Sequence, residues 1–216
     1  MNKAFSLAIV ALTVTSTFSV QAQTSDKILT ELSNKAKNYS TVYAEYSSQL
    51  IDKVNGVDVK QSGKVYVKGE KYYVELGDYT MISDGQSVWT YEKAANDCYI
   101  DYLEDVADGA LSPSKMFTIW EDGFKHEYKS EVKEGAQTLF WINLYPTNPS
   151  EKNYHTIQLY VDKAKMEVVK FIVKGREGSD IVYKLDKFTP NQAITDAQFK
   201  FDAKKFPGVN IIDNRI

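Results

Sequence analysis

Residues 62–91 read SGKVYVKGEKYYVELGDYTMISDGQSVWTY, and this stretch decides the fold class. Apolar and polar residues alternate through short runs, and Gly69-Glu70, Gly77-Asp78 and Asp84-Gly85 separate these runs. Alternation with a period of two is typical of strands, and clustered Gly and Asp residues mark the turns between them. The stretch therefore predicts consecutive antiparallel strands joined by tight turns, which is a β-meander.

The same pattern extends in both directions from this stretch. Upstream, residues 41–48 alternate, and Asn55-Gly56 is a strong hairpin signal. Downstream, alternation resumes in further runs, at His126–Val132, Leu139–Tyr145, Thr156–Val161, Glu167–Lys174 and Ile181–Phe188. Residues 199–209 are expected to add an edge segment. About ten antiparallel strands result, and one sheet of that size must curl.

Two helices are expected beside the sheet. Apolar residues at helical spacing between Ile28 and Ala36, with a polar cap before them, predict a helix over residues 25–38. Ser112-Pro113 is a plausible start for a short helix over residues 114–121, which gathers Met116, Phe117, Ile119 and Trp120. Both helices have an apolar face, so we expect them to cover the concave side of the sheet.

The N-terminus predicts secretion. Lys3 precedes an apolar run over residues 4–14, and Val20-Gln21-Ala22 is a small-residue cleavage site. The run is too short for a transmembrane helix, which needs about 20 apolar residues. We therefore expect residues 1–22 to be a signal peptide and residues 23–216 to be one soluble domain.

Composition excludes several classes of function. The formal net charge is −3, from 26 Lys+Arg and 29 Asp+Glu that are interspersed, so nucleic-acid binding is not expected. Cys98 is the only cysteine, so no internal disulfide can form, and we expect it to be a small buried residue in a strand. His126 and His155 are expected at exposed strand positions. No metalloprotease, serine-hydrolase or P-loop motif occurs, so the sequence predicts no enzyme, cofactor or metal.

Aromatic and branched apolar residues are the remaining signal. They fit an ordinary core, and they also fit the wall of a lipid cavity between the curved sheet and its helical cover. On the second interpretation the acyl-chain cavity is lined by Tyr46, Val65, Val67, Tyr72, Val74, Trp89, Tyr91, Met116, Phe117 and Trp120.

The chain resembles the periplasmic lipoprotein carriers of the LolA type. The resemblance rests on residues 62–67 (SGKVYV), residues 82–91 (ISDGQSVWTY), and Phe199-Lys200-Phe201 with residues 206–209 (FPGV). It implies an incomplete β-barrel whose helices form a lid. It also implies a periplasmic monomer that takes acylated lipoproteins from an inner-membrane ABC-type exporter, shields their acyl chains and delivers them to an outer-membrane acceptor.

One position departs from the family pattern. Members usually carry Arg-Pro after the first quoted strand, and that Arg tethers the lid, whereas this chain has Lys68-Gly69-Glu70-Lys71. Lys68 or Lys71 is the candidate replacement. Three alternatives stay open beside the carrier: a lipid-sensing regulatory protein of the same half-barrel fold, a general lipid-binding protein, and a hydrolase with an unrecognised site.

Overall fold

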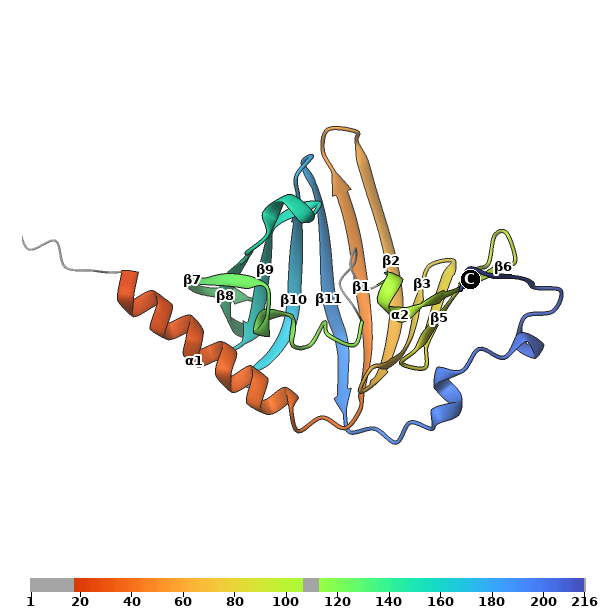
Figure 1. The fold of residues 1–216 in the computed structure, drawn as a ribbon. Helices are drawn as coiled ribbons and strands as arrows, with labels where there is room; N and C mark the ends of the chain where they lie inside the picture. The colour runs from red at the N-terminus through yellow and green to blue at the C-terminus, as the bar shows by residue number, and fades with distance from the viewer. Residues whose placement is uncertain (1–17, 107–112, 216) are drawn as a thin grey trace, which may run out of the picture.

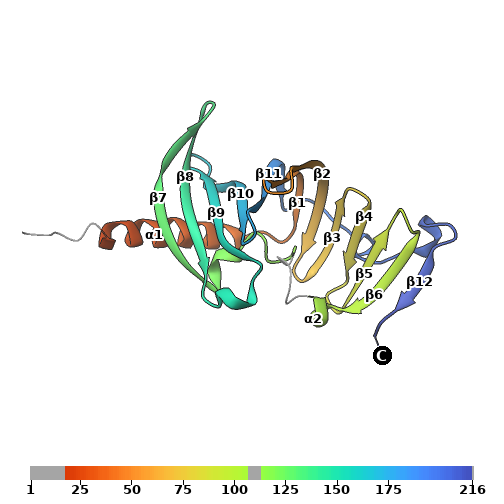
Figure 2. The same ribbon diagram turned by 90° about the horizontal axis from the view of Figure 1, so that it is seen from above.

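The computed structural model describes residues 18–106 and 113–215 (Figure 1). Its strands form one open sheet in the order β12-β6-β5-β4-β3-β2-β1-β11-β10-β9-β8-β7. The strands are β1 (Val42–Asp52), β2 (Val57–Lys68), β3 (Lys71–Leu76), β4 (Tyr79–Ser83), β5 (Ser87–Glu92), β6 (Asp97–Tyr102), β7 (Phe124–Glu134), β8 (Gln137–Pro146), β9 (Tyr154–Asp162), β10 (Glu167–Gly175), β11 (Ser179–Pro190) and β12 (Asn210–Asp213). Figure 2 shows that the sheet curves without closing, so the predicted curved, incomplete barrel is confirmed.

The helical elements are few. They are α1 (Phe18–Ala36), α2 (Leu103–Val106) and the 3-10 turns η1 (Ile119–Glu121), η2 (Pro149–Glu151), η3 (Asp196–Phe199) and η4 (Ala203–Lys205). The helix α1 begins before the predicted Ser25 and ends two residues before the predicted Asn38. Its apolar face packs Ile28, Leu29 and Leu32 into one buried cluster with Ile142 and Leu144 of β8. The predicted first helix, and its contact with the sheet, are therefore confirmed.

Alternation along the strands places one face of the sheet in the core. In β1, Val42, Ala44 and Tyr46 are buried while the residues between them are half-buried. The same buried face continues from β1 onto β2 and β3, because Ala44 pairs with Val65, which in turn pairs with Val74. The buried face is the concave one, on which α1 lies (Figure 1).

The predicted helix over residues 114–121 is wrong. Residues 113–121, here called the strap, form turns that end in the 3-10 turn η1. The amide of Thr118 donates to the carbonyl of Lys115, and the amide of Glu121 donates to the carbonyl of Thr118. These are bonds of three-residue spacing, and so short a segment gains little from helix formation by itself. The strap instead distributes its apolar side chains over two separate clusters.

The C-terminal part also differs from expectation. Residues 199–209, predicted as an edge segment, hold 3-10 turns, and the edge strand β12 follows them, parallel to β6. Phe199 is fully buried, and the Phe206 ring lies 4.3 Å from that of Tyr91, centroid to centroid. Burial of these rings against the convex face stabilises the segment without backbone pairing to a neighbouring strand. Figure 2 shows this segment running behind the sheet.

Two other predictions concern single positions. Cys98 is buried in β6 as expected, and burial raises its pKa to about 11. Residues 1–17 and 107–112, which include most of the predicted signal peptide and the predicted cap Ser112, lie outside the described residues. The signal peptide therefore stays a prediction.

Candidate functional site

The concave face of β1–β3 forms a continuous apolar wall. Tyr46, Val65, Val67 and Tyr72 are buried there, and Val74 packs beside them. Burial raises the pKa of Tyr72 to about 12, and burial also raises the pKa of Tyr46. Both phenols thus stay neutral over the whole physiological range. The structure brings together the five predicted residues of these strands on one surface.

A glycine makes room for the largest ring on this wall. The hydroxyl of Tyr46 donates a hydrogen bond of 3.2 Å to the carbonyl oxygen of Glu75. A Cβ atom at Gly63 would lie 2.1 Å from that oxygen and 2.8 Å from the Tyr46 ring. Such contacts are forbidden, so Gly63 is the residue that lets the ring lie flat against β2 and β3.

The strap lies across this wall. Phe117 packs into the wall cluster, and its ring centroid lies 5.5 Å from that of Phe188. Trp120 packs into the other cluster, beneath α1, and its indole nitrogen donates a 2.9 Å hydrogen bond to the Ser33 hydroxyl. Met116 contacts both clusters. Three predicted site residues therefore come from the strap: Met116 and Phe117 pack against the wall, whereas Trp120 packs beneath α1.

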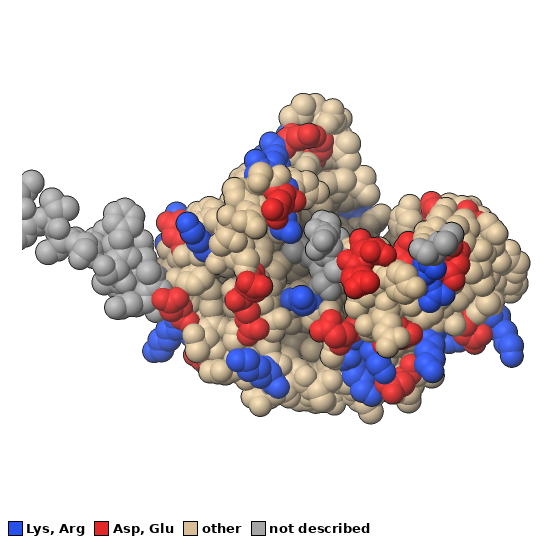
Figure 3. Space-filling view, viewed as in Figure 1, with Lys and Arg blue, Asp and Glu red and all other residues tan. Residues whose placement is uncertain are grey.

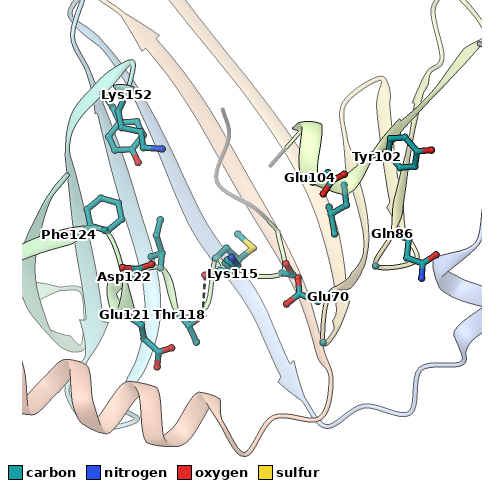
Figure 4. A pocket seen from close by; sticks show the side chains of 18 residues that line it. Glu70, Gln86, Tyr102, Glu104, Lys115, Thr118, Glu121, Asp122, Phe124 and Lys152 are labelled. Atoms are coloured by element: carbon teal, nitrogen blue, oxygen red, sulfur yellow. Dashed lines mark hydrogen bonds between the residues drawn. The ribbon is translucent and has the colours of Figure 1, made fainter. Parts of the chain in front are cut away.

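A cavity of about 1030 Å³ opens on the outer side of the strap (Figure 4). Figure 4 shows Phe124 and Lys152 on one side and Glu70, Gln86 and Tyr102 on the other. Met116 alone among the ten predicted site residues, all of them described, lines this cavity. The predicted wall thus lies behind the strap, and the open cavity lies in front of it.

The mouth of this cavity is charged. Its lining includes the carboxylates of Glu70, Glu104, Glu121 and Asp122 and the ammonium groups of Lys115 and Lys152. Figure 3 shows acidic residues gathered around the central hollow, on a face where charges of both signs are otherwise interspersed. The polar rim and the apolar strap beneath it make an amphipathic cleft.

The predicted placement of Trp89 and Tyr91 in the cavity wall is wrong. Val88 pairs with Ser83 and is buried in the wall cluster, whereas Trp89 pairs with Ile82 on the opposite face. Because side chains alternate between faces, Tyr91 shares the convex face with Trp89. There the Tyr91 ring meets Phe206 of the C-terminal segment, so both residues lie away from the wall.

Polar contacts fasten α1 to its surroundings. Nδ1 of His126 lies 3.1 Å from the Ser25 hydroxyl, and Nε2 lies 3.3 Å from a carboxylate oxygen of Asp26. At the other end, Lys35 pairs with Glu167 at 2.8 Å. His126 is therefore half-buried and tied to α1, not at an exposed position as predicted. His155 is exposed, as predicted.

Lys68 and Lys71, the candidate replacements for the family's lid arginine, contact the C-terminal segment. Lys68 pairs with Asp196 at 2.9 Å, and Lys71 pairs with the same carboxylate at 3.4 Å. Asp196 belongs to η3 in the C-terminal segment, on the convex side. The two ammonium groups lower the pKa of Asp196 through hydrogen bonds and charge. Among the described residues both lysines pair with Asp196, and neither pairs with the strap or α1.

Within residues 18–106 and 113–215, no three His, Cys, Asp or Glu side chains come close enough to hold a metal ion. In that same part of the chain, no helix has the length and apolar character needed to cross a bilayer.

Comparisons with known proteins place the chain in a family. The family model described as outer membrane lipoprotein carrier protein LolA matches residues 37–202. The chain belongs to the LolA family. Outer-membrane lipoprotein carrier proteins of two Histophilus somni strains, 2336 and 129Pt, are each 26% identical over 192 residues, covering 86% of this chain and 87% of the relative.

A solved structure agrees on the fold. An uncharacterized conserved protein from Thermus thermophilus superposes with a TM-score of 0.59 at 13% identity, covering 89% of this chain and 100% of that chain. The LolA-family match spans the apolar wall, the strap and η3, and it includes the long β1–β2 hairpin.

Proposed function

We propose that this protein is a periplasmic carrier that binds the acyl chains of lipoproteins against its concave wall. One observation carries the proposal: an apolar wall formed by three neighbouring strands is covered by a strap without regular helical structure. Such a cover can leave the wall at a lower cost than a packed helix, because few backbone hydrogen bonds hold it. Membership of the LolA family supports the same conclusion.

The energetics explain why a cover is needed. Each CH₂ group moved from water to an apolar site contributes about 0.8 kcal/mol, so acyl chains do not cross an aqueous compartment unshielded. A bare wall would associate with other apolar surfaces when empty. Met116 and Phe117 occupy the wall in the closed state, and incoming acyl chains would take their place. Binding and release then depend on the equilibrium between two conformations.

The route follows from the family. We propose that an inner-membrane ABC-type exporter supplies the lipoprotein and that an outer-membrane acceptor receives it. The names of the Histophilus somni relatives, outer-membrane lipoprotein carrier proteins, support this direction of transport. Secretion by a signal peptide ending at Ala22 would bring the chain to the periplasm, where we expect it to act as a monomer without catalysis.

Native mass spectrometry of the protein purified from its own cell envelope tests this function. We expect a mature chain starting at Gln23 and a second population that carries acylated lipoprotein. The same measurement on delipidated protein mixed with a synthetic triacylated lipopeptide should give a one-to-one complex. A protein that stays free in both experiments is not a carrier. A protein that carries only phospholipid is a lipid-binding protein of another kind.

A further inference from the structure

The upper end of the β1–β2 hairpin exposes apolar side chains. Among the side chains that the structure describes, six large apolar ones are exposed. Three of the six, Leu50, Val54 and Val59, belong to this end of the hairpin, whereas the others lie on β4, β6 and β12. Figure 1 shows that the hairpin extends beyond α1 and the strap. Exposed apolar surface is therefore concentrated at one protruding end of the molecule.

Val54 is an unusual residue for its turn. Residues 53–56, here called the tip, are all exposed, and Val54 is 76% exposed, the largest fraction among the six. Gly, Pro, Asn, Asp and Ser dominate turns, whereas β-branched residues favour strands. An apolar side chain held in water contributes little to folding, so its place at the tip indicates a role outside folding.

Hydrogen bonds hold the tip in one shape. The Asp52 carboxylate accepts bonds of 2.9 Å from the amides of Val54 and Asn55, and one of 2.7 Å from the Asn55 side chain. Gly56 has a φ of 69°, a left-handed conformation that glycine adopts without strain. The turn is therefore already formed, and Val54 needs no ordering of the chain before it meets a partner.

Further apolar residues follow directly below the tip. Val57 is the first residue of β2, and Val59, two residues further along, pairs with Leu50 of β1. Two residues of a strand span about 6.6 Å. Interfacial segments bury their apolar face about 5–10 Å deep, at the boundary between lipid headgroups and acyl chains. The depth of this apolar end therefore matches that boundary layer.

Charges of opposite sign balance around the tip. Residues 52–60 hold two acidic and two basic side chains, and the adjacent β10–β11 turn adds Arg176 and Glu177, so each group sums to zero. Figure 3 shows an uncharged cap at the top of the molecule, with charged side chains below it. Anionic headgroups would gain no net attraction from this end, so contact with a membrane depends on apolar burial.

Size and shape identify the partner. A stable protein interface takes about 20–30 residues from each side, and residues 50–60 are about half that number. A fluid bilayer needs no matching surface and accepts a small apolar projection. We propose that the tip, with Leu50, Val57 and Val59 below it, inserts into the apolar boundary of a phospholipid bilayer. This contact is weak and reversible, and it goes beyond the proposed function because it needs no cargo.

Flotation with protein-free vesicles of phosphatidylcholine tests the contact. We expect the parent to float with the vesicles, and added phosphatidylglycerol to leave its partition coefficient unchanged. Val54→Asp should lower that coefficient at least about tenfold, whereas Val54→Phe should raise it, because the inserted apolar area shrinks or grows. Ala136→Asp, in the exposed β7–β8 turn, is the control for added charge. Circular dichroism checks that each variant is folded, and equal partition of parent and Val54→Asp would overturn the contact.

A fluorescent label locates the contact on the molecule. Cys98 is the only native cysteine and is buried, so a cysteine introduced at the surface is labelled selectively. We expect bimane on Val54→Cys to shift to the blue when vesicles are added, and bimane on Ala136→Cys to stay unshifted. Vesicle binding without a shift at position 54 would overturn the contact. A parent that binds only vesicles containing envelope proteins would also overturn it, because its partner would be a protein.

Discussion

The indole nitrogen of Trp120 donates a buried hydrogen bond of 2.9 Å to the hydroxyl of Ser33, across a sequence separation of 87 residues. This bond joins the strap to α1, the two elements that cover the concave face. Both groups are removed from water, so neither finds another partner without movement of the chain. We infer that the strap and α1 stabilise each other in the closed state.

Ser33→Ala should loosen this closed state. The Trp120 N–H would stay buried without an acceptor, which costs about 1–3 kcal/mol. We expect a lower midpoint of thermal unfolding and faster uptake of a fluorescent fatty acid, measured by stopped-flow. Asn34→Ala, at an exposed position of α1, is the control. Unchanged uptake in the Ser33 variant would mean that the bond does not restrain the cover.

Met116→Asp should separate binding from folding. Met116 contacts both buried clusters, so a carboxylate there disfavours the closed strap and any acyl chain lying against it. We expect fatty-acid binding to fall at least about tenfold while the far-ultraviolet circular dichroism of the sheet is kept. Asn34→Asp, at an exposed position of α1 that does not line the cavity, is the control for added charge. Collapse of the whole fold would identify the strap as ordinary core.

Two tryptophans should differ in their contribution to stability. Trp120 is 6% exposed, so Trp120→Ala should lower the free energy of unfolding by about 3–5 kcal/mol. Trp89 is half-buried on the convex face, so Trp89→Ala should cost less and leave fatty-acid binding unchanged. Urea denaturation beside a binding titration measures both effects. A binding defect in the Trp89 variant would contradict the observed register.

Asp162 should make stability depend on acid. Its carboxylate accepts hydrogen bonds from the amides of Lys165 and Ala164 and from the side chain of Gln137. The Lys165 amide is the chief cause that lowers the pKa of Asp162 below its ordinary value of 3.8. The stabilisation is therefore complete above that value and is lost as pH falls through the lower folded-state pKa.

Urea unfolding of Asp162→Asn beside the parent measures this contribution. The difference in free energy of unfolding should be clear near neutral pH and should shrink in acid, as the parent carboxylate is protonated. A difference that is constant over this range would mean that the turn is held by contacts other than the ionised carboxylate.

Local patterns predicted most of the sheet but not the layers on either side of it. The turns at Gly69, Gly77 and Asp84-Gly85 are local features, so the meander could be predicted from them. The face on which Trp89 lies could not be predicted, because alternation alone does not say whether Val88 or Trp89 points toward the wall. The burial of Val88 settles this choice, and that burial depends on contacts with residues distant in the sequence.

The strap shows the same limit. Four apolar residues between Met116 and Trp120 resemble a helix face, but they serve two clusters that lie on different strands. Only the curvature of the sheet, set by all of its strands together, decides that one short segment must reach both. The wall residues of β1–β3 were predictable because strict alternation fixes their face. The hydrogen bonds of His126 and Ser33 were not, because their partners are far away in the sequence.

The four residues of β12 have a consequence for the fate of the protein at high concentration. An unclosed sheet has two free margins, and unpaired backbone groups there can recruit further strands and start aggregation. At one margin β12 pairs with β6 and becomes the edge itself, and with four residues it offers few unpaired backbone groups. At the other, β7 carries alternating Lys and Glu residues from Lys125 to Lys133, which discourage stacking by charge. Both margins of the sheet therefore discourage polymerisation through strand pairing.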